Sequence, residues 1–221
     1  MEKYTDICHE VGITIHGCID GDYYGNREEI CGIPIIDSET AFDDPVKLAE
    51  YRNYNFFCAT NWSPEQNAGI TRNRLKRQRL IDQLDALGLN VISIVDPTAK
   101  INGTSKIGRG CFVDCMVMLE AQVILEDYVN IYSHSCIGHH TRIDRNSVIQ
   151  RQCSIAGQAH FETNCFLSVS VKALKTGATF GHDTFIHECM YIRRGTIPGE
   201  VIKINGANMS RVYGEQDRYA E

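Results

Sequence analysis

From Val95 onward this chain places an apolar residue at every sixth position, fourteen times in succession. The series is Val95, Ile101, Ile107, Val113, Leu119, Leu125, Ile131, Ile137, Ile143, Ile149, Ile155, Phe161, Leu167 and Ala173. After one extra residue it resumes as Phe180, Ile186 and Ile192. This period fits neither a helix, which repeats about every 3.6 residues, nor the simple alternation of a strand. The repeat therefore predicts a solenoid in which each short strand ends at a tight corner that the aliphatic residue fills from inside.

A second register lies four residues after the first, and there the side chain is small or a valine. Three of the ten cysteines, Cys111, Cys153 and Cys165, stand in this register, where a thiol acts as a small apolar group. The chain also lacks the short, loop-rich character of a disulfide-stabilised secreted protein. We therefore expect reduced cysteines and a cytoplasmic protein.

The charge and hydropathy of the chain exclude several function classes. The formal net charge is -6 over 221 residues, which argues against a nucleic-acid partner. No apolar run approaches the roughly 20 residues that a membrane-spanning helix needs. The N-terminal segment MEKYTDICHEVG does not have the pattern of a signal peptide.

Residues before the repeat show alternating strand and helix signals. We expect a short helix that closes at Gly12, strands at 13–19, 34–36, 55–60 and 90–95, and a helix over 72–87. Such alternation is typical of a small α/β unit with a parallel sheet. The domain prediction is an α/β acceptor-binding unit at 1–92, the solenoid at 93–197, and a polar tail at 198–221. A basic run at 72–79 either holds a phosphate or forms a solvated helix face, and we favour the solvated face.

Three stretches of this chain carry a family resemblance. The segments GCIDGDYYGNREEICGIPIIDS, IGHHTRI and IAGQAHFETNCFLS resemble the sialic-acid-type and bacillosamine-type sugar acyltransferases. The resemblance implies a truncated Rossmann-like α/β unit followed by a left-handed parallel β-helix, assembled as a homotrimer. It also implies transfer of an acetyl group from acetyl-CoA to an amino or hydroxyl group of a sugar, often nucleotide-linked, in polysaccharide biosynthesis. The family's first strand and glycine-rich loop have no counterpart here, so either the acceptor is held differently or the natural start lies upstream.

Acyl transfer from a thioester needs a base for the attacking group and a hydrogen-bond donor for the oxyanion. A neutral histidine suits the base, because histidine titrates near working pH. The family pattern V-G-H-D matches Ile137, Gly138, His139 and His140, which identifies His139 as the candidate general base. His140 replaces the usual acidic residue, so a carboxylate that would fix the tautomer of His139 is missing. If the two histidines occupy a strand, their side chains point to opposite sides.

A coil of about 18 residues, three repeats long, places Gly157 directly above His139. In the family a glycine at this position donates its backbone N–H to the acyl carbonyl, and the absence of a side chain permits the close approach. The alternatives are a plain turn glycine at 157 and a solvent-facing histidine at 139.

The resemblance also suggests binding residues. Lys172, Lys175 and Arg193, together with Arg194, are candidates for the phosphates of CoA. Asp20 and Asn61 match positions that contact the acceptor nucleotide, although a turn aspartate and a loop asparagine are the plain alternatives. Tyr132 and Val148 stand where the family usually has asparagine and a second histidine, and we place Tyr132 with the acceptor site.

Two rival functions remain open at this point. The γ-type carbonic anhydrases share the solenoid and bind zinc through histidines, and here His134 and His139, like His182 and His187, have H-x4-H spacing. No third ligand is apparent at a neighbouring coil, so we expect no metal. The second rival is an inactive scaffold trimer, which Tyr132 and Val148 favour.

Overall fold

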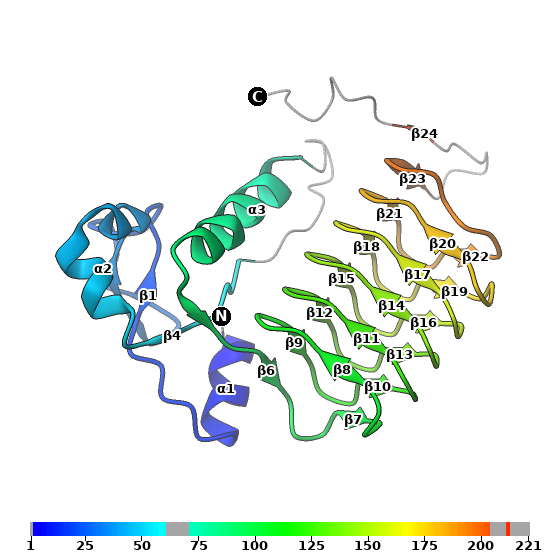
Figure 1. Ribbon diagram of the computed structural model, residues 1–221, viewed down its shortest axis with the longest axis horizontal. Helices are drawn as coiled ribbons and strands as arrows, with labels where there is room; N and C mark the ends of the chain where they lie inside the picture. The colour runs from blue at the N-terminus through cyan, green and yellow to red at the C-terminus, as the bar shows by residue number, and fades with distance from the viewer. Residues whose placement is uncertain (1, 61–70, 204–210, 213–221) are drawn as a thin grey trace.

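The computed structural model describes residues 2–60, 71–203, 211 and 212. An N-terminal unit precedes a solenoid of stacked coils, and Figure 1 shows the unit at the left and the coils rising to the right. No helix in these described ranges is both long and apolar enough to cross a membrane. The N-terminal unit comes first along the chain and leads directly into the solenoid.

The described residues of the N-terminal unit form three α-helices, one 3-10 helix and two small sheets. The helices are α1 (Glu2–Glu10), α2 (Pro45–Tyr51), α3 (Thr71–Ala86) and the 3-10 helix η1 (Glu39–Asp43). The first sheet has the order β1 (Cys18–Ile19), β3 (Ile33–Asp37), β2 (Glu29–Ile30), and the second pairs β4 (Asn55–Phe56) with β5 (Asn90–Val91).

The sequence predicted one parallel sheet here, and the structure has two sheets with an antiparallel pair, β2 with β3. Cys31 and Gly32 connect these strands, with φ of 51° and 75°. Left-handed conformations at both turn residues produce a tight hairpin, so the paired strands must be antiparallel. The strands predicted at 13–19, 55–60 and 90–95 are also shorter, reduced to β1, β4 and the separate β5 and β6.

Every strand of the solenoid belongs to one of three sheets. Sheet 1 contains β6 (Ile94–Val95), β9 (Phe112–Val113), β12 (Asn130–Ile131), β15 (Val148–Ile149), β18 (Phe166–Leu167), β21 (Phe185–Ile186), β23 (Glu200–Ile202) and β24 (Arg211–Val212). Sheet 2 contains β7 (Lys100–Ile101), β10 (Met118–Leu119), β13 (Cys136–Ile137), β16 (Ser154–Ile155), β19 (Lys172–Ala173) and β22 (Tyr191–Ile192). Sheet 3 contains β8 (Lys106–Ile107), β11 (Ile124–Leu125), β14 (Arg142–Ile143), β17 (His160–Phe161) and β20 (Thr179–Phe180).

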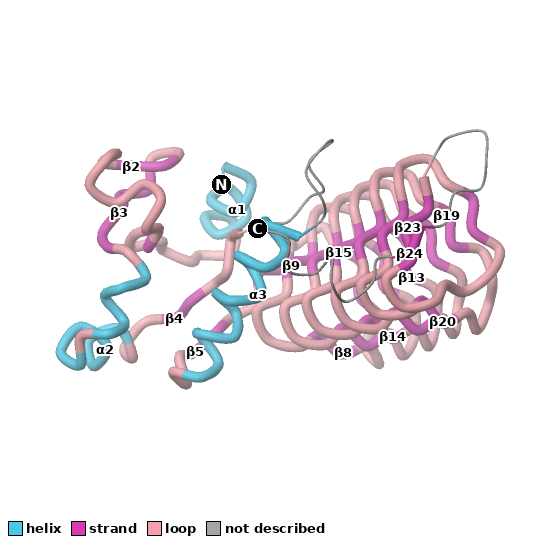
Figure 2. Tube along the Cα trace, turned by 90° about the horizontal axis from the view of Figure 1, so that it is seen from above, coloured by secondary structure: helices cyan, strands magenta, loops and turns pink. Residues whose placement is uncertain are grey.

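The strands of successive coils pair in parallel with a spacing of 18 residues, as Met118 with Cys136 and Cys136 with Ser154. Strand β24 instead pairs antiparallel with β23. The pairing of Phe161 with Phe180 is one residue longer, which is the extra residue that the sequence showed. Figure 2 shows the coils from above as a continuous stack. These stacked parallel sheets confirm the predicted β-helix and fit the left-handed form that the resemblance implies.

The core of the β-helix is built from the two predicted registers. Ile131, Ile137 and Ile143 are fully buried, and they belong to one cluster with the valines and cysteines of the second register. Burial in this apolar interior raises the pKa of the Cys111 and Cys153 thiols to about 12. All ten cysteines are free thiols.

A buried arginine joins α3 to the β-helix. Arg77 is fully buried, and its guanidinium donates to the carbonyl oxygens of Cys58 (3.1 Å) and Tyr128 (3.0 Å) and to Oδ1 of Asn146 (2.8 Å). Arg74 is also largely buried and pairs with Asp183 at 2.6 Å. The prediction of a solvated face was therefore wrong for these two arginines, because α3 lies against the coils.

Helix α1 also packs on the β-helix. The Tyr4 ring meets the Phe112 ring edge-on at 4.7 Å between centroids, and the Tyr4 hydroxyl lies 3.2 Å from that of Tyr132. Lys3 forms an ion pair with Asp114, which is fully buried. Helix α1 therefore contacts the first coils of the β-helix through aromatic rings, hydroxyl groups and an ion pair.

The substitution Ile143→Asp should unfold the β-helix. It removes a fully buried aliphatic chain and buries a charge with no partner, at a combined cost of more than about 4 kcal/mol. Thr179→Asp is the control, since Thr179 is exposed on the same sheet. Circular dichroism melting should show a folded control and no cooperative transition for Ile143→Asp; a native-like melt would contradict our assignment of the inward register.

Replacement of Arg77 by Gln should release α3 from the coils. Removal of the guanidinium leaves buried carbonyl and amide oxygens without donors, at a cost of about 1–3 kcal/mol for each acceptor left unsatisfied. Arg79→Gln is the matched control, since Arg79 is an exposed arginine on the same helix. Hydrogen exchange of the α3 amides should accelerate in Arg77→Gln alone, and equal exchange in both variants would show that Arg77 does not anchor the helix.

Candidate active site

The candidate base lies at a corner between sheets 2 and 3. Strand β13 ends at Ile137, and residues 138–141 form the turn that leads into β14. Ile137 and Thr141 are buried and anchor the turn from inside, whereas His139 and His140 are exposed. The repeat thus holds the backbone of this corner firmly while it presents both imidazoles outward.

Gly157 lies directly against the imidazole of His139, as the 18-residue coil predicted. The backbone N–H of Gln158 donates to the carbonyl oxygen of His139 at 2.7 Å. A Cβ atom at Gly157 would lie 2.7 Å from Nε2 of His139, closer than side-chain atoms normally approach. The absent side chain therefore lets the Nε2 edge of the imidazole face the Gly157 backbone.

Gly138 keeps the N–H of Gly157 open. At comparable corners a carboxylate from the preceding coil accepts the equivalent N–H: Glu120 from His139 at 2.9 Å, and Glu162 from His182 at 2.8 Å. Gly138 holds that position below Gly157, and a Cβ there would lie 2.5 Å from the Gly157 nitrogen. Within the described chain the Gly157 N–H donates to no acceptor. The corner thus combines an imidazole nitrogen with an unused backbone donor.

The two histidines contact each other. They lie in the turn and not in a strand, so the expectation of opposite orientations does not hold. His140 has a left-handed φ of 58°, and the Nδ1 atoms of the two rings are 3.0 Å apart. The rings are nearly perpendicular, at 89°.

Sequence reasoning missed Glu120. Its carboxylate fixes the backbone of His139, not its ring. The 18-residue spacing of the coils could have identified this contact. Residue 120 lies one coil before Gly138, so its side chain is beside the backbone N–H of the next residue, His139.

The candidate phosphate-binding cations lie on coils that follow Gly157. Lys172 is on β19, where its amine donates to Oγ of Ser154 and the carbonyl oxygen of Gln152, both at 3.0 Å. Lys175 is exposed in the turn after β19, and Arg193 is exposed after β22. Arg194 forms an ion pair with Glu200, which holds the pKa of that carboxyl below its usual range, so Arg194 has a structural partner.

The candidate acceptor residues lie elsewhere. Tyr132 is buried at the corner between sheets 1 and 2, where its hydroxyl meets Tyr4, and burial raises its pKa. Asp20 follows β1, and its Oδ1 accepts the N–H of Asp22 at 3.0 Å, as in an ordinary turn aspartate. Asn61 lies outside the described residues. The structure therefore unites His139, His140 and Gly157, and it does not bring Tyr132 or Asp20 into the same corner.

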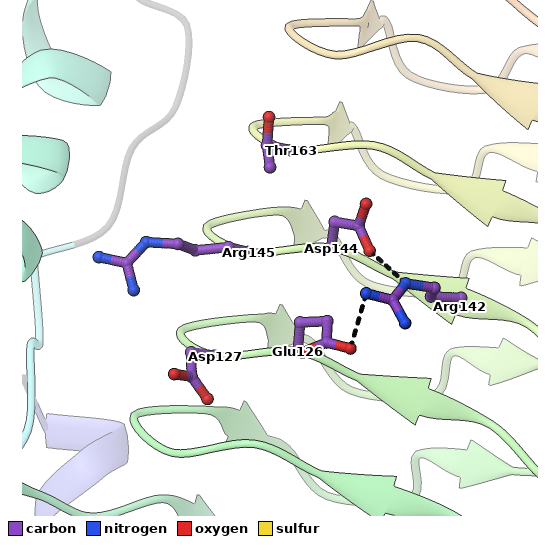
Figure 3. Close-up of a pocket in the computed structure, with 6 residues that line it drawn as sticks. All are labelled: Glu126, Asp127, Arg142, Asp144, Arg145 and Thr163. Carbon is purple, nitrogen blue, oxygen red and sulfur yellow. Dashed lines mark hydrogen bonds and ion pairs between the residues drawn. The ribbon is translucent and has the colours of Figure 1, made fainter.

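A shallow hollow of about 280 Å³ lies beside sheet 3 (Figure 3). Its lining residues are Glu126, Asp127, Arg142, Asp144, Arg145 and Thr163. Arg142 bridges Glu126 and Asp144 at 2.9 and 2.7 Å, as the dashed lines in Figure 3 show. These opposite charges satisfy one another, and the hollow does not include the histidine corner.

Within the described residues, no histidine belongs to a group of three potential metal ligands. In the described ranges the single group with three potential metal-ligand atoms within 4.8 Å is Asp96, Asp114 and Cys115, and it contains no histidine. His134 and His139 lie at different corners, on either side of β13. His182 instead contacts Asp183, with 3.0 Å between Nδ1 and the carboxylate.

Comparison with solved structures gives clear matches, whereas no family model and no curated protein match this chain. The acetyltransferase domain of PglB from Neisseria gonorrhoeae FA1090 aligns with a TM-score of 0.74 at 15% identity, covering 96% of this chain and 94% of that domain. The same domain in complex with acetyl coenzyme A aligns with a TM-score of 0.71 at 16% identity, with coverages of 96% and 93%. A variant of GDP-perosamine N-acetyl transferase from Caulobacter crescentus, in complex with CoA and GDP-perosamine, aligns with a TM-score of 0.60 at 17% identity, with coverages of 97% and 92%.

This chain shares the fold of these acetyltransferases. The alignments cover nearly the whole chain, including most of the N-terminal unit. The resemblance noted in the sequence is therefore confirmed for the β-helix.

Alanine substitutions at the two glycines should have different effects on stability. Gly138→Ala forces a Cβ into the backbone of the next coil and should cost about 1–3 kcal/mol. Gly157→Ala meets only the movable ring of His139, so it should cost less than about 1 kcal/mol but displace the imidazole.

Urea unfolding and the imidazole NMR signals of His139 measure the two effects. We expect a lower unfolding midpoint for Gly138→Ala and shifted His139 signals for Gly157→Ala. Equal midpoints, or unmoved His139 signals in Gly157→Ala, would contradict the contact geometry.

Proposed function

We propose that this chain is an acetyl-CoA-dependent sugar acyltransferase with His139 as general base. The observation that carries the proposal is the corner itself, where the Nε2 edge of His139 faces Gly157 and the Gly157 N–H is unused. General-base catalysis and an oxyanion donor are the two functions that acyl transfer requires of a protein. The shared fold with acetyltransferases supports this reading.

In the proposed reaction, Nε2 of His139 removes a proton from the amino or hydroxyl group of the sugar as that group attacks the thioester carbonyl. A new C–N or C–O bond forms, and the carbonyl oxygen takes up negative charge. The charge is stabilised by the N–H of Gly157, because Gly138 leaves no side chain in competition for it. The carbonyl then re-forms, the C–S bond breaks, and His139 returns the proton to the departing thiolate.

The donor is proposed to lie along the coils that follow Gly157. Lys172, Lys175 and Arg193 would bind the phosphates of CoA by charge-assisted hydrogen bonds. No catalytic metal is part of this proposal. The solved complex of the PglB domain with acetyl coenzyme A supports the choice of donor.

The acceptor is proposed to be a nucleotide-linked sugar held by the N-terminal unit. The neighbour that binds GDP-perosamine supports this class of acceptor. Asp20, Asn61 and Tyr132 remain candidates for binding it, and Tyr132 would do so only if its contact with Tyr4 opens. The proposed division is an acceptor unit at 1–92, an acyltransferase unit at 93–197 and a tail at 198–221.

The same proposal includes a homotrimer in the cytoplasm, acting in polysaccharide biosynthesis. Both histidines are exposed on a single chain. Acyl transfer requires exclusion of water from the thioester, since water would compete as the acyl acceptor. A neighbouring copy would cover the corner and complete the site.

The test is mass spectrometry of products after incubation with acetyl-CoA and a panel of free and nucleotide-linked amino sugars. A thiol-release assay would be confounded by the ten cysteines. His139→Ala should lower turnover by about 10²–10⁴-fold, because it removes the base. His134→Ala is the control, since His134 is another exposed histidine, at the preceding corner, and its loss should leave turnover at the wild-type level.

Several outcomes would contradict the proposal. Equal turnover in His139→Ala would remove the proposed base. Acetyl-CoA binding without any product would favour a scaffold trimer, and stoichiometric zinc with carbonic anhydrase activity would favour the metal enzyme. Acetylation of free sugars alone would argue against a nucleotide-linked acceptor.

A further inference from the structure

The contact between His139 and His140 carries one further inference, which rests on the proposed function. Their Nδ1 atoms are 3.0 Å apart, a hydrogen-bond distance. A neutral imidazole has one N–H donor and one bare nitrogen acceptor. One Nδ1 must therefore donate and the other accept, so the tautomers of the two rings are coupled.

The direction of this bond follows from what His139 has to do. Its Nε2 edge faces Gly157, so Nε2 is the nitrogen placed to take a proton. A neutral ring with a bare Nε2 must carry its hydrogen on Nδ1. We propose that His140 is a positioning residue that accepts the Nδ1–H of His139 and thereby holds the base in its active tautomer.

No carboxylate performs this role here. Within the described residues, Glu120 bonds the backbone of His139, and neither imidazole contacts an acidic side chain. The other charged or titratable groups of the neighbourhood are Arg142 on β14, Cys136 on β13, and Lys172 and Lys175 on the coil of β19. Arg142 is paired with Glu126 and Asp144, and Lys172 bonds Ser154. His140 is thus the partner that the fold supplies to the ring.

Two substitutions test the role at this left-handed position, because the chain already places other side chains at equivalent corners. His140→Met removes the acceptor, and Met116 already occupies the equivalent corner position with a φ of 56°. His140→Asp supplies a carboxylate, and aspartate tolerates a left-handed φ. His134→Met is the control at the preceding corner, where φ is 61°.

The first readout is the tautomer of His139, from long-range ¹H–¹⁵N NMR of the full chain with labelled histidine. Signals are assigned with His139→Gln and His140→Met. At neutral pH we expect the proton of His139 on Nδ1 and that of His140 on Nε2, and His140→Met should return His139 to a mixture of tautomers. A proton of His139 found on Nε2 in the wild type would overturn the proposal.

The second readout is kinetic. His140→Met should lower kcat roughly tenfold with little change in the KM for acetyl-CoA, because the base is mispositioned and the donor site is untouched. His140→Asp should retain kcat and move the acid limb of its pH profile upward, since a carboxylate favours the imidazolium. An unchanged kcat and pH profile in both variants would overturn the role.

The two readouts separate this inference from the proposed function. Absence of acetyl transfer in the wild type with the expected tautomers would reject the function and keep the coupling of the two rings. Full activity together with the Nε2 tautomer, or with no effect of His140→Met, would keep the function and reject the role of His140.

Discussion

Every position in the β-helix depends on the hydrogen-bonded register between successive coils. Strands pair at a spacing of 18 residues. Each corner residue therefore lies one strand spacing from the residue 18 positions later in the chain. A side chain of one coil can therefore accept a hydrogen bond from a backbone N–H of the next coil, as Glu120 does from His139. The chemistry of a corner is set by three consecutive coils and cannot be read from one turn alone.

The candidate site arises at this corner because two side chains are absent. At two other corners, the carboxylates of Glu120 and Glu162 accept a hydrogen bond from the backbone N–H that lies above them. Gly138 removes that acceptor, and Gly157 removes the Cβ that would otherwise displace the imidazole. An unused backbone donor and the Nε2 edge of the imidazole thus lie at the same corner. The repeat supplies rigidity, since the buried Ile137 and Thr141 hold the turn from inside.

A second constraint fixes the N-terminal unit to the coils. The buried guanidinium of Arg77 bonds neutral carbonyl and amide oxygens from the segment after β4 and from two coils of the β-helix. A buried charge of this kind is held by several acceptors at once, because each lost bond leaves it less compensated. The two parts of the chain consequently share one interface, which would hold an acceptor unit at a constant place relative to the histidine corner.

The sequence by itself determined the β-helix, its inward registers, the extra residue before Phe180 and the position of Gly157 above His139. All of these follow from one local period that repeats many times, so each coil confirms the next. The tertiary structure alone decided the burial of Arg77, the hairpin of β2 and β3 and the contact between the two histidines. These depend on how non-repeating segments pack and on how side chains turn at left-handed corners, and neither leaves a periodic signal in the chain.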